Sequence, residues 1–289
     1  MNSLHKQIEE KKAVALSSVI ASMFLTGGKL FVGLMTGSLG ILSEAAHSAL
    51  DFGAALITYF AVRVSDKPAD HNHHYGHHKV ENLSALIETF LLLITCIWII
   101  KEAVARLFFK EAVLEVNFWS FAIIIASILI DFSRARALSK AAIKYNSQAL
   151  EADAMHFSSD ILSSLVVLLG LILVQLDIKI ADPIAALIVA ILVIVASIRL
   201  GKRAVDALLD RAPKELSQIV INEIMCVNGV CDCHKIRLRQ SGPRVYGDIH
   251  VVVKREITFI EGHEISNAIE ERLASRGIDI VVHFEPEEP

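Results

Sequence analysis

Features that would mark several common functional classes are missing from this 289-residue sequence. Basic residues are not in excess, because 28 Lys and Arg stand against 32 Asp and Glu and give a net charge of −4, so nothing indicates a nucleic-acid partner. No glycine-rich loop of the kind that cradles nucleotide phosphates is present, which favours an ion gradient over ATP as an energy source. Charged residues are also sparse in several long stretches of the chain.

Apolar residues fill those stretches and make up 54% of the chain, whereas an ordinary soluble domain has about 45–50%. Spanning a bilayer as a helix takes about 20 predominantly apolar residues. The segments of that length are 13–35, 39–64, 80–102, 114–133, 147–175 and 179–200. They predict a multi-pass α-helical membrane protein with six transmembrane helices within residues 1–207. A span of full membrane length follows the charged N-terminal segment, so we expect no cleaved signal peptide.

The orientation follows from the distribution of Lys and Arg, which favour cytoplasmic loops. Basic residues occur in the N-terminal segment and after the second, fourth and sixth spans, whereas the first loop has none. The loop between the third and fourth spans, on the opposite side of the membrane, also carries basic residues, which reduces the difference between the two sides. On balance both termini are predicted to be cytoplasmic, and the four cysteines are therefore expected to be reduced thiols.

Residues 208–289 have a different pattern and are predicted to form a separate cytoplasmic domain. Helical spacing of apolar residues occurs at 213–227 and 261–277, and the second of these segments ends on a glycine. Segments 233–240, 245–253 and 278–284 read as strands. The expected order is αββαβ, an α+β fold with both helices on one face of a small sheet. A core of this size is marginal alone, so pairing with a second copy is expected.

Two of the apolar segments contain the same polar pair. His47 and Asp51, and again His156 and Asp160, are separated by four positions and would share one helix face. An ionisable group at the bilayer centre costs about 2.5–3.5 kcal/mol on the more lenient scale. One explanation is a His–Asp hydrogen bond within each helix. We favour the other, a divalent cation held by two imidazoles and two carboxylates, because the pair occurs twice.

Four stretches around these pairs resemble a known family. They are TGSLGILSEAAHSALD at 36–51, HHYGHHKVENLSAL at 73–86, EADAMHFSSDIL at 151–162 and ADPIAALIVA at 181–190. They are similar to helices of the cation diffusion facilitator family, and the likeness extends over the whole chain. The resemblance implies a homodimeric exporter of the bacterial inner membrane that exchanges a divalent cation for protons. It also implies a ferredoxin-like tail and a transport site formed by His47, Asp51, His156 and Asp160.

A histidine-rich loop, ADHNHHYGHHK at 69–79, lies between the second and third spans. One interpretation of its composition is a solvated polar loop or a segment that binds metal nonspecifically. The resemblance implies a metal site at Asp70, His73 and His77.

In the tail, the residue pattern alone favours surface or packing roles for the isolated histidines. The resemblance implies a two-metal site at the dimer interface, where Glu285 replaces the family's Asp. Its ligands would be His234, His250, His263, His283 and Glu285. We expect Cys231 and Cys233, which lie beside the first of these histidines, to be bystander thiols.

The function expected from these features is Zn²⁺/H⁺ antiport out of the cytoplasm by alternating access. Two histidines and two aspartates suit Zn²⁺, and Cd²⁺ or Co²⁺ could occupy the same ligands. A membrane-bound zinc sensor or scaffold without transport is the alternative, but it gives no reason for two pairs deep in the bilayer. A membrane metallohydrolase would need an open coordination position and a general base, and four protein ligands argue against it.

Overall fold

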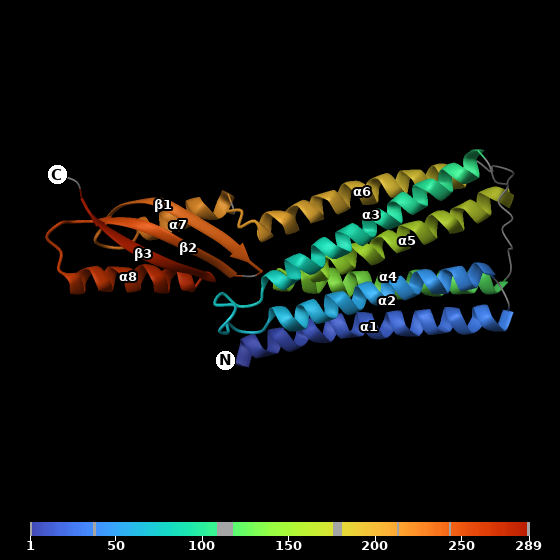
Figure 1. Cartoon of the computed structure of the whole chain (residues 1–289), viewed down its shortest axis with the longest axis horizontal. Helices are drawn as coiled ribbons and strands as arrows, with labels where there is room; N and C mark the ends of the chain where they lie inside the picture. Colours follow the sequence, from blue (N-terminus) through green and yellow to red (C-terminus); the bar gives the residue numbers. More distant parts are fainter. Residues whose placement is uncertain are drawn as a thin grey trace. The chain divides into compact units, whose positions relative to one another are not determined.

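The computed structural model describes residues 2–36, 39–108, 118–175, 181–212, 214–242 and 244–287. The chain divides into two compact units, Met1–Ala204 and Val205–Pro289. The first unit is built from long helices, and the second contains a three-stranded sheet (Figure 1). Each unit is considered by itself below.

Six helices form the first unit, as the apolar segments predict. They are α1 (Asn2–Thr36), α2 (Leu39–Ser65), α3 (Lys79–Phe108), α4 (Phe118–Tyr145), α5 (Gln148–Gln175) and α6 (Ala181–Leu208). The largest difference from the prediction is in α4, which continues well past residue 133 because its basic second half is amphipathic. Ala135, Leu138 and Ala142 from that half are buried in the core. The α4–α5 turn places Asn146 at φ 49°, and the Ser147 hydroxyl then accepts from the Leu150 N–H at the start of α5.

Apolar side chains cover the outside of this bundle. Phe24 is 70% exposed, Leu50 72% and Phe90 64%, which would be unfavourable in water and is expected in contact with lipid. Among the described residues, three segments are long and apolar enough to cross a bilayer: Ile8–Met35, Ala45–Ser65 and Lys79–Ala105. The helical transmembrane domain is confirmed, and crossing of the bilayer by α4, α5 and α6 stays a prediction.

Small residues let the helices approach closely inside the bundle. Ala85, Ala152 and Ala204 are each 0% exposed and pack with Leu200, which joins α3, α5 and α6. At Gly201 on α6, an added Cβ would lie 2.7 Å from a methyl carbon of Thr89. Two helices, α2 and α5, also contact each other directly, and this contact brings the two His–Asp pairs together.

The second unit has the predicted αββαβ order. Its elements are α7 (Lys214–Met225), β1 (Val230–Ser241), β2 (Arg244–Val253), α8 (Phe259–Ala274) and β3 (Ile278–Pro286). The central strand β2 pairs antiparallel with β1 and parallel with β3. A capping box starts α8, in which the Thr258 hydroxyl accepts from the Glu261 N–H and the Glu261 carboxylate accepts from the Thr258 N–H.

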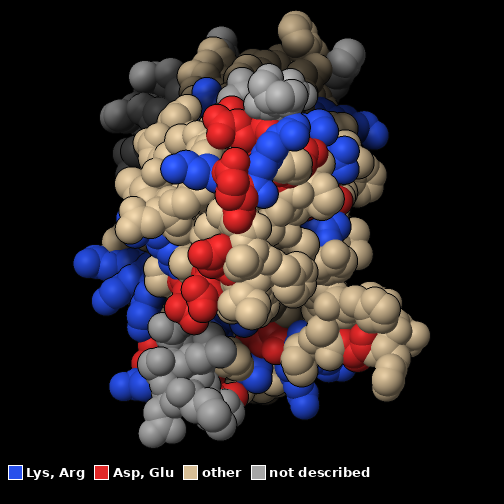
Figure 2. All heavy atoms as spheres, turned by 90° about the vertical axis from the view of Figure 1, so that its left-hand side faces the viewer, with Lys and Arg blue, Asp and Glu red and all other residues tan. Residues whose placement is uncertain are grey.

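One face of this sheet carries the core. On β2, Ile249, Val251 and Val253 alternate on the buried face and pack with residues of α7 and α8. The intervening His250 therefore lies on the opposite face, which neither helix covers in the single chain. Acidic and basic side chains are mixed on the side of the molecule in Figure 2, and neither sign dominates it.

Candidate metal sites

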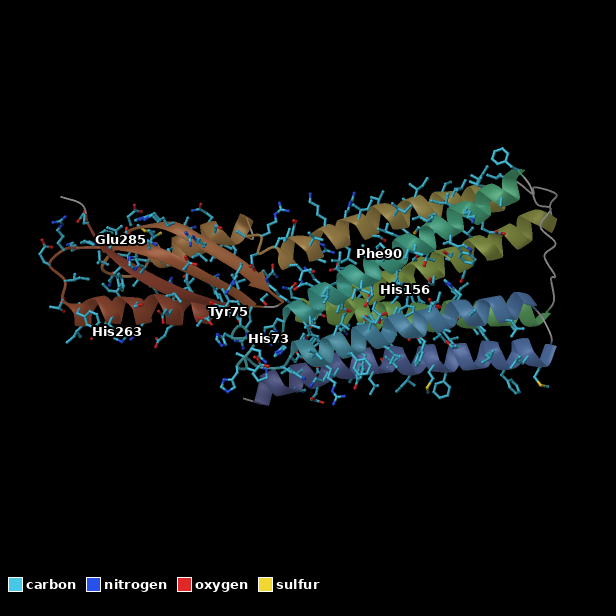
Figure 3. The ribbon with its side chains drawn as sticks, in the orientation of Figure 1. His73, Tyr75, Phe90, His156, His263 and Glu285 are labelled. Carbon is cyan, nitrogen blue, oxygen red and sulfur yellow. The ribbon has the colours of Figure 1, made fainter. Side chains whose placement is uncertain are left out.

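The two His–Asp pairs meet in the interior of the helical bundle, where α2 faces α5. The Nε2 atom of His156 lies 3.0 Å from Oδ1 of Asp51 and 3.6 Å from Oδ2 of Asp160. The Nε2 atom of His47 lies 4.0 Å from Oδ1 of Asp51 and 3.9 Å from Oδ1 of Asp160. His156, labelled in Figure 3, is 5% exposed. The ligand atoms of Asp51, His156 and Asp160 form one compact group, and His47 lies beside two of these residues without joining that group. We call the four residues together the cage.

The cage has the dimensions of a transition-metal site. In a tetrahedral zinc site with ligand bonds of about 2.0 to 2.1 Å, neighbouring ligand atoms are about 3.3 Å apart. The four nitrogen–oxygen separations between the histidines and the aspartates of the cage lie between 3.0 and 4.0 Å, close to that value. Atoms of Asp51, His156 and Asp160 already lie within 4.8 Å of one another. Because the ligands are two nitrogens and two carboxylates, a zinc-like ion fits better than Mg²⁺ or Ca²⁺, which prefer all-oxygen sites.

The bundle interior also contains charged residues for which the sequence analysis assigned no role. Arg134 on α4 donates from Nη1 to Oδ1 of Asp131 at 3.1 Å and from Nη2 to the Ser18 hydroxyl at 3.0 Å. Its guanidinium lies over the ring of Phe157, 3.4 Å from the centroid. Glu88 on α3 is completely buried. Asp131 and Glu88 fall inside predicted spans, so their charge at membrane depth was a usable signal.

The loop before α3 brings together the three residues that the family resemblance singled out. Asp70 lies 3.4 Å from Nδ1 of His73 and 3.3 Å from Nε2 of His77, and the two imidazole rings are 4.5 Å apart. The backbone N–H groups of His73 and Asn72 donate to Oδ1 of Asp70 and lower the pKa of its carboxyl. Gly76, at φ 76°, allows the tight turn that returns His77 to Asp70. The three residues form a cluster suited to a divalent cation.

The tail brings part of its predicted ligand set together on the open face of the sheet. The register pairs His234 with His250 and His250 with His283, one residue from each strand. Glu285 lies 2.9 Å from Nε2 of His234 and accepts a hydrogen bond of 2.6 Å from Nδ1 of His250. That hydrogen bond lowers the pKa of the Glu285 carboxyl. His234, His250 and Glu285 form a compact group, with ligand atoms within 4.8 Å of one another.

Two predicted tail ligands stand apart from this group. The ring of His283 is 4.6 Å from that of His250, but His283 is exposed and does not join the three-residue group. His263 is exposed on α8, where it contacts Asn267 at 3.3 Å (Figure 3). Because α8 covers the opposite face of the sheet, one chain alone does not bring His263 to Glu285. Cys233 packs against the tail core, where burial raises the pKa of its thiol.

Comparisons with known proteins cover nearly the whole chain. The model of the cation efflux transmembrane domain matches residues 15–209, and that of the cation efflux protein cytoplasmic domain matches residues 212–287. The cation-efflux pump FieF of Shigella boydii serotype 18 is 30% identical over 293 aligned positions, which cover 99% of this chain and 95% of the relative. FieF of Yersinia enterocolitica is 32% identical over 280 positions, covering 95% and 92%. A solved MamM CTD variant, 24% identical, covers 26% of this chain and 98% of its own, with a TM-score of 0.25.

The first domain model alone spans more than half of the sequence, and the relatives match both units. The match to cation efflux proteins therefore covers both the helical bundle, which contains the cage, and the α/β tail. On these grounds the chain belongs to the cation efflux, or cation diffusion facilitator, family of membrane transporters.

Proposed function

We propose that this transporter exports Zn²⁺ from the cytoplasm in exchange for protons, by alternating access to the cage. The observation that carries the proposal is the meeting of His47 and Asp51 with His156 and Asp160 inside the bundle. Two nitrogen and two carboxylate ligands favour zinc over harder cations, while Cd²⁺ and Co²⁺ remain competing substrates. Metal binding requires deprotonated ligands, so protons and metal compete for the same site.

Histidine makes that competition effective near neutral pH. An unperturbed imidazole has a pKa of about 6.5, so a site with two histidines can exchange metal for protons within the physiological range. In the proposed cycle the cage loads Zn²⁺ from the cytoplasm, the bundle rearranges, and protons from the other side displace the metal. The protonated carrier then returns.

The proposal also includes the membrane location, the dimer and the metal sites outside the cage. We place the protein in a bacterial inner membrane with all six helices crossing it and both termini in the cytoplasm, following the distribution of basic residues. The tail supports a homodimer, because its sheet leaves one face uncovered and that face carries the histidine group. In a dimer, the partner could supply the ligands that one chain leaves apart. Zinc at the Asp70 loop and in the tail would then have a structural or regulatory role.

The test is zinc uptake into proteoliposomes under an imposed pH gradient. Wild type is compared with Asp51→Ala and Asp160→Ala, and Asp279→Ala, an exposed position on β3, is the matched control. We expect transport by wild type and by the control, and none by the two cage variants when these still elute as dimers. Equal transport by all four proteins would remove the cage from the mechanism. Undiminished uphill zinc movement after collapse of the pH gradient would remove the proton coupling.

A membrane-bound zinc sensor or scaffold is the second candidate, because the group of His234, His250 and Glu285 lies wholly within the tail. In that case zinc would bind to the tail and no zinc would cross the bilayer. The same assay separates the two functions: a protein that binds zinc in the tail but gives no uptake in proteoliposomes is a sensor.

A further inference from the structure

A buried group of charged and hydroxyl side chains ties four segments together at the end of the bundle where α1 begins. The Nζ atom of Lys11 on α1 donates to Oδ1 of Asp66, directly after α2, at 2.6 Å, and to Oε1 of Glu81, at the start of α3, at 2.8 Å. Glu81 also accepts hydrogen bonds from the hydroxyls of Ser65 on α2 and Ser147 before α5. Lys11 is 6% exposed and Glu81 is 2% exposed. We call this group the hub.

The hub closes the loop that carries the cluster of Asp70, His73 and His77. Asp66 precedes Asp70 by four residues, and Glu81 follows His77 by four. The loop leads from α2 to α3 at the same end of the bundle as the beginning of α1 (Figure 1). Because both hub carboxylates bond to the same ammonium nitrogen, the two ends of the loop are held together on α1.

Holding the ends of the loop favours cation binding by its three ligands. A loop with fixed ends has fewer conformations to lose when its side chains close on a cation. Without Lys11, the carboxylates of Asp66 and Glu81 would be buried together with no cation between them, and they would repel each other. Among the described residues, Oδ2 of Asp66 has no hydrogen-bond partner, so this carboxylate depends on its bond to Lys11. The ends of the loop would then separate.

Stability alone gives little reason for such a hub. Buried ion pairs usually add little net stability compared with apolar side chains of the same size. The position of Asp66 and Glu81 on either side of the ligand cluster is the feature that indicates a role in cation binding.

We propose that Lys11 is a positioning residue for the Asp70 loop, and that a cation bound in the loop in turn strengthens the attachment of α1 to α2 and α3. The proposal rests on the proposed zinc binding in the loop. Such coupling is reciprocal: if the hub raises the affinity of the loop for a cation, the cation stabilises the hub by the same factor. Further along α1, Nζ of Lys29 donates to the hydroxyl of Ser48, the neighbour of His47, at 2.9 Å. The helix that the loop cation would fix therefore also contacts the surroundings of the cage.

The experiment is a zinc titration of the full-length protein in detergent, followed by hydrogen exchange with mass spectrometry. The loop, the start of α1 and the cage lie in different peptides, so each is read separately. We expect Lys11→Met to move the midpoint of zinc protection in peptides of residues 67–80 to about 10-fold higher zinc or more, because groups that only support a metal ligand typically change affinity about 10–100-fold. The midpoint in the cage peptides should not move. Lys12→Met is the matched control, because this neighbouring lysine bonds to Glu9 at 3.3 Å and lies outside the hub.

The reciprocal effect is measured without changing the hub. Zinc should slow the exchange of residues 6–16 in wild type and should not slow it in Asp70→Ala, which replaces an exposed loop ligand. If Lys11→Met does not fold, this comparison decides the proposal by itself. An equal effect of zinc on α1 in both proteins would overturn the proposal.

The remaining outcomes also decide it. A wild-type loop midpoint in Lys11→Met would overturn the proposal, and so would an equal shift of the loop and cage midpoints, because Lys11 would then act only on the stability of the whole bundle. Zinc protection of the cage without protection of the loop would refute the proposal and leave the antiport standing. Coupled protection of the loop and α1 in a protein that fails to take up zinc in proteoliposomes would refute the antiport and leave the role of Lys11 standing.

Discussion

The group of His234, His250 and Glu285 offers the sharpest test of metal binding, because it can be studied in the tail alone. Its ligands come from three different strands, which only folding brings within 4.8 Å of one another. Zinc should therefore bind the folded tail far more tightly than the unfolded chain and should raise its stability. The perturbation is Glu285→Gln, which keeps the size of the side chain and removes the charged ligand.

The expected magnitude follows from linkage. At a free zinc concentration of 100 Kd, a single site adds about 2.7 kcal/mol to the free energy of unfolding. Because about 1 kcal/mol shifts Tm by about 4–8 °C in a domain of this size, zinc should raise Tm by about 11–22 °C. Loss of even an outer-shell group, which only hydrogen-bonds to a metal ligand, typically weakens metal affinity about 10–100-fold. At the same zinc concentration, the free energy of unfolding of the Glu285→Gln tail should then rise by only about 0.4–1.4 kcal/mol.

The assay is thermal unfolding of the fragment Val205–Pro289, followed by circular dichroism with zinc or with a chelator. Glu271→Gln, an exposed position on α8, is the control and should show the full wild-type shift. The reasoning is refuted if zinc leaves the wild-type Tm unchanged. It is equally refuted if Glu285→Gln shifts as far as wild type, because the carboxylate would then not be a ligand.

Three further predictions concern selectivity, pH and packing. His47→Asp should broaden transport towards Mn²⁺, Fe²⁺ and Cd²⁺, because a carboxylate is a harder ligand than imidazole. Competition between these ions and zinc in the transport assay would measure this, and an unaltered profile would show that selectivity resides elsewhere. Arg272 of α8 and Arg276, just beyond that helix, lower the pKa of Glu223 below its usual 4.5. The stability that Glu223 contributes is therefore present above that pH and is lost as the pH falls through the lowered value. The Tm difference between the wild-type tail and Glu223→Gln should accordingly vanish in acid, and a difference that persists would contradict this. Gly201→Ala should destabilise the bundle by about 1–3 kcal/mol, because the added Cβ would lie 2.7 Å from the Thr89 side chain. Gly53→Ala is the control, because a Cβ at Gly53 would have no neighbouring atom within 4 Å. Equal melting temperatures of the two variants in detergent would refute the packing argument.

Local patterns in the sequence predicted most of the fold. The six apolar segments correspond to α1–α6, and the change from helical spacing to alternation predicted the order of elements in the tail. The prediction for α4 stopped near residue 133, because hydropathy detects lipid-facing surface and misses an amphipathic helix that continues beyond it. Leu138 in that continuation is 1% exposed and belongs to the core.

The sites were predictable only in part. The spacing of His47 and Asp51 shows that they share a helix face, because helix geometry is local. Sequence spacing could not show that Thr58 from α2 donates a hydrogen bond to Glu88 from α3, since that depends on how α2 packs against α3. In the tail, the separation of His263 from Glu285 depends on which face of the sheet α8 covers.

By itself the sequence determined the helices, the strands and which polar residues share a face, because each depends on a repeat of a few residues along one segment. The tertiary structure alone decided which faces meet. It turned two separate His–Asp pairs into one cage, placed Arg134 and Glu88 in the same interior, and left His263 on the far side of the sheet. The physical reason is that side chains distant in sequence come together through the packing of whole helices and strands, which depends on the shape of the entire core.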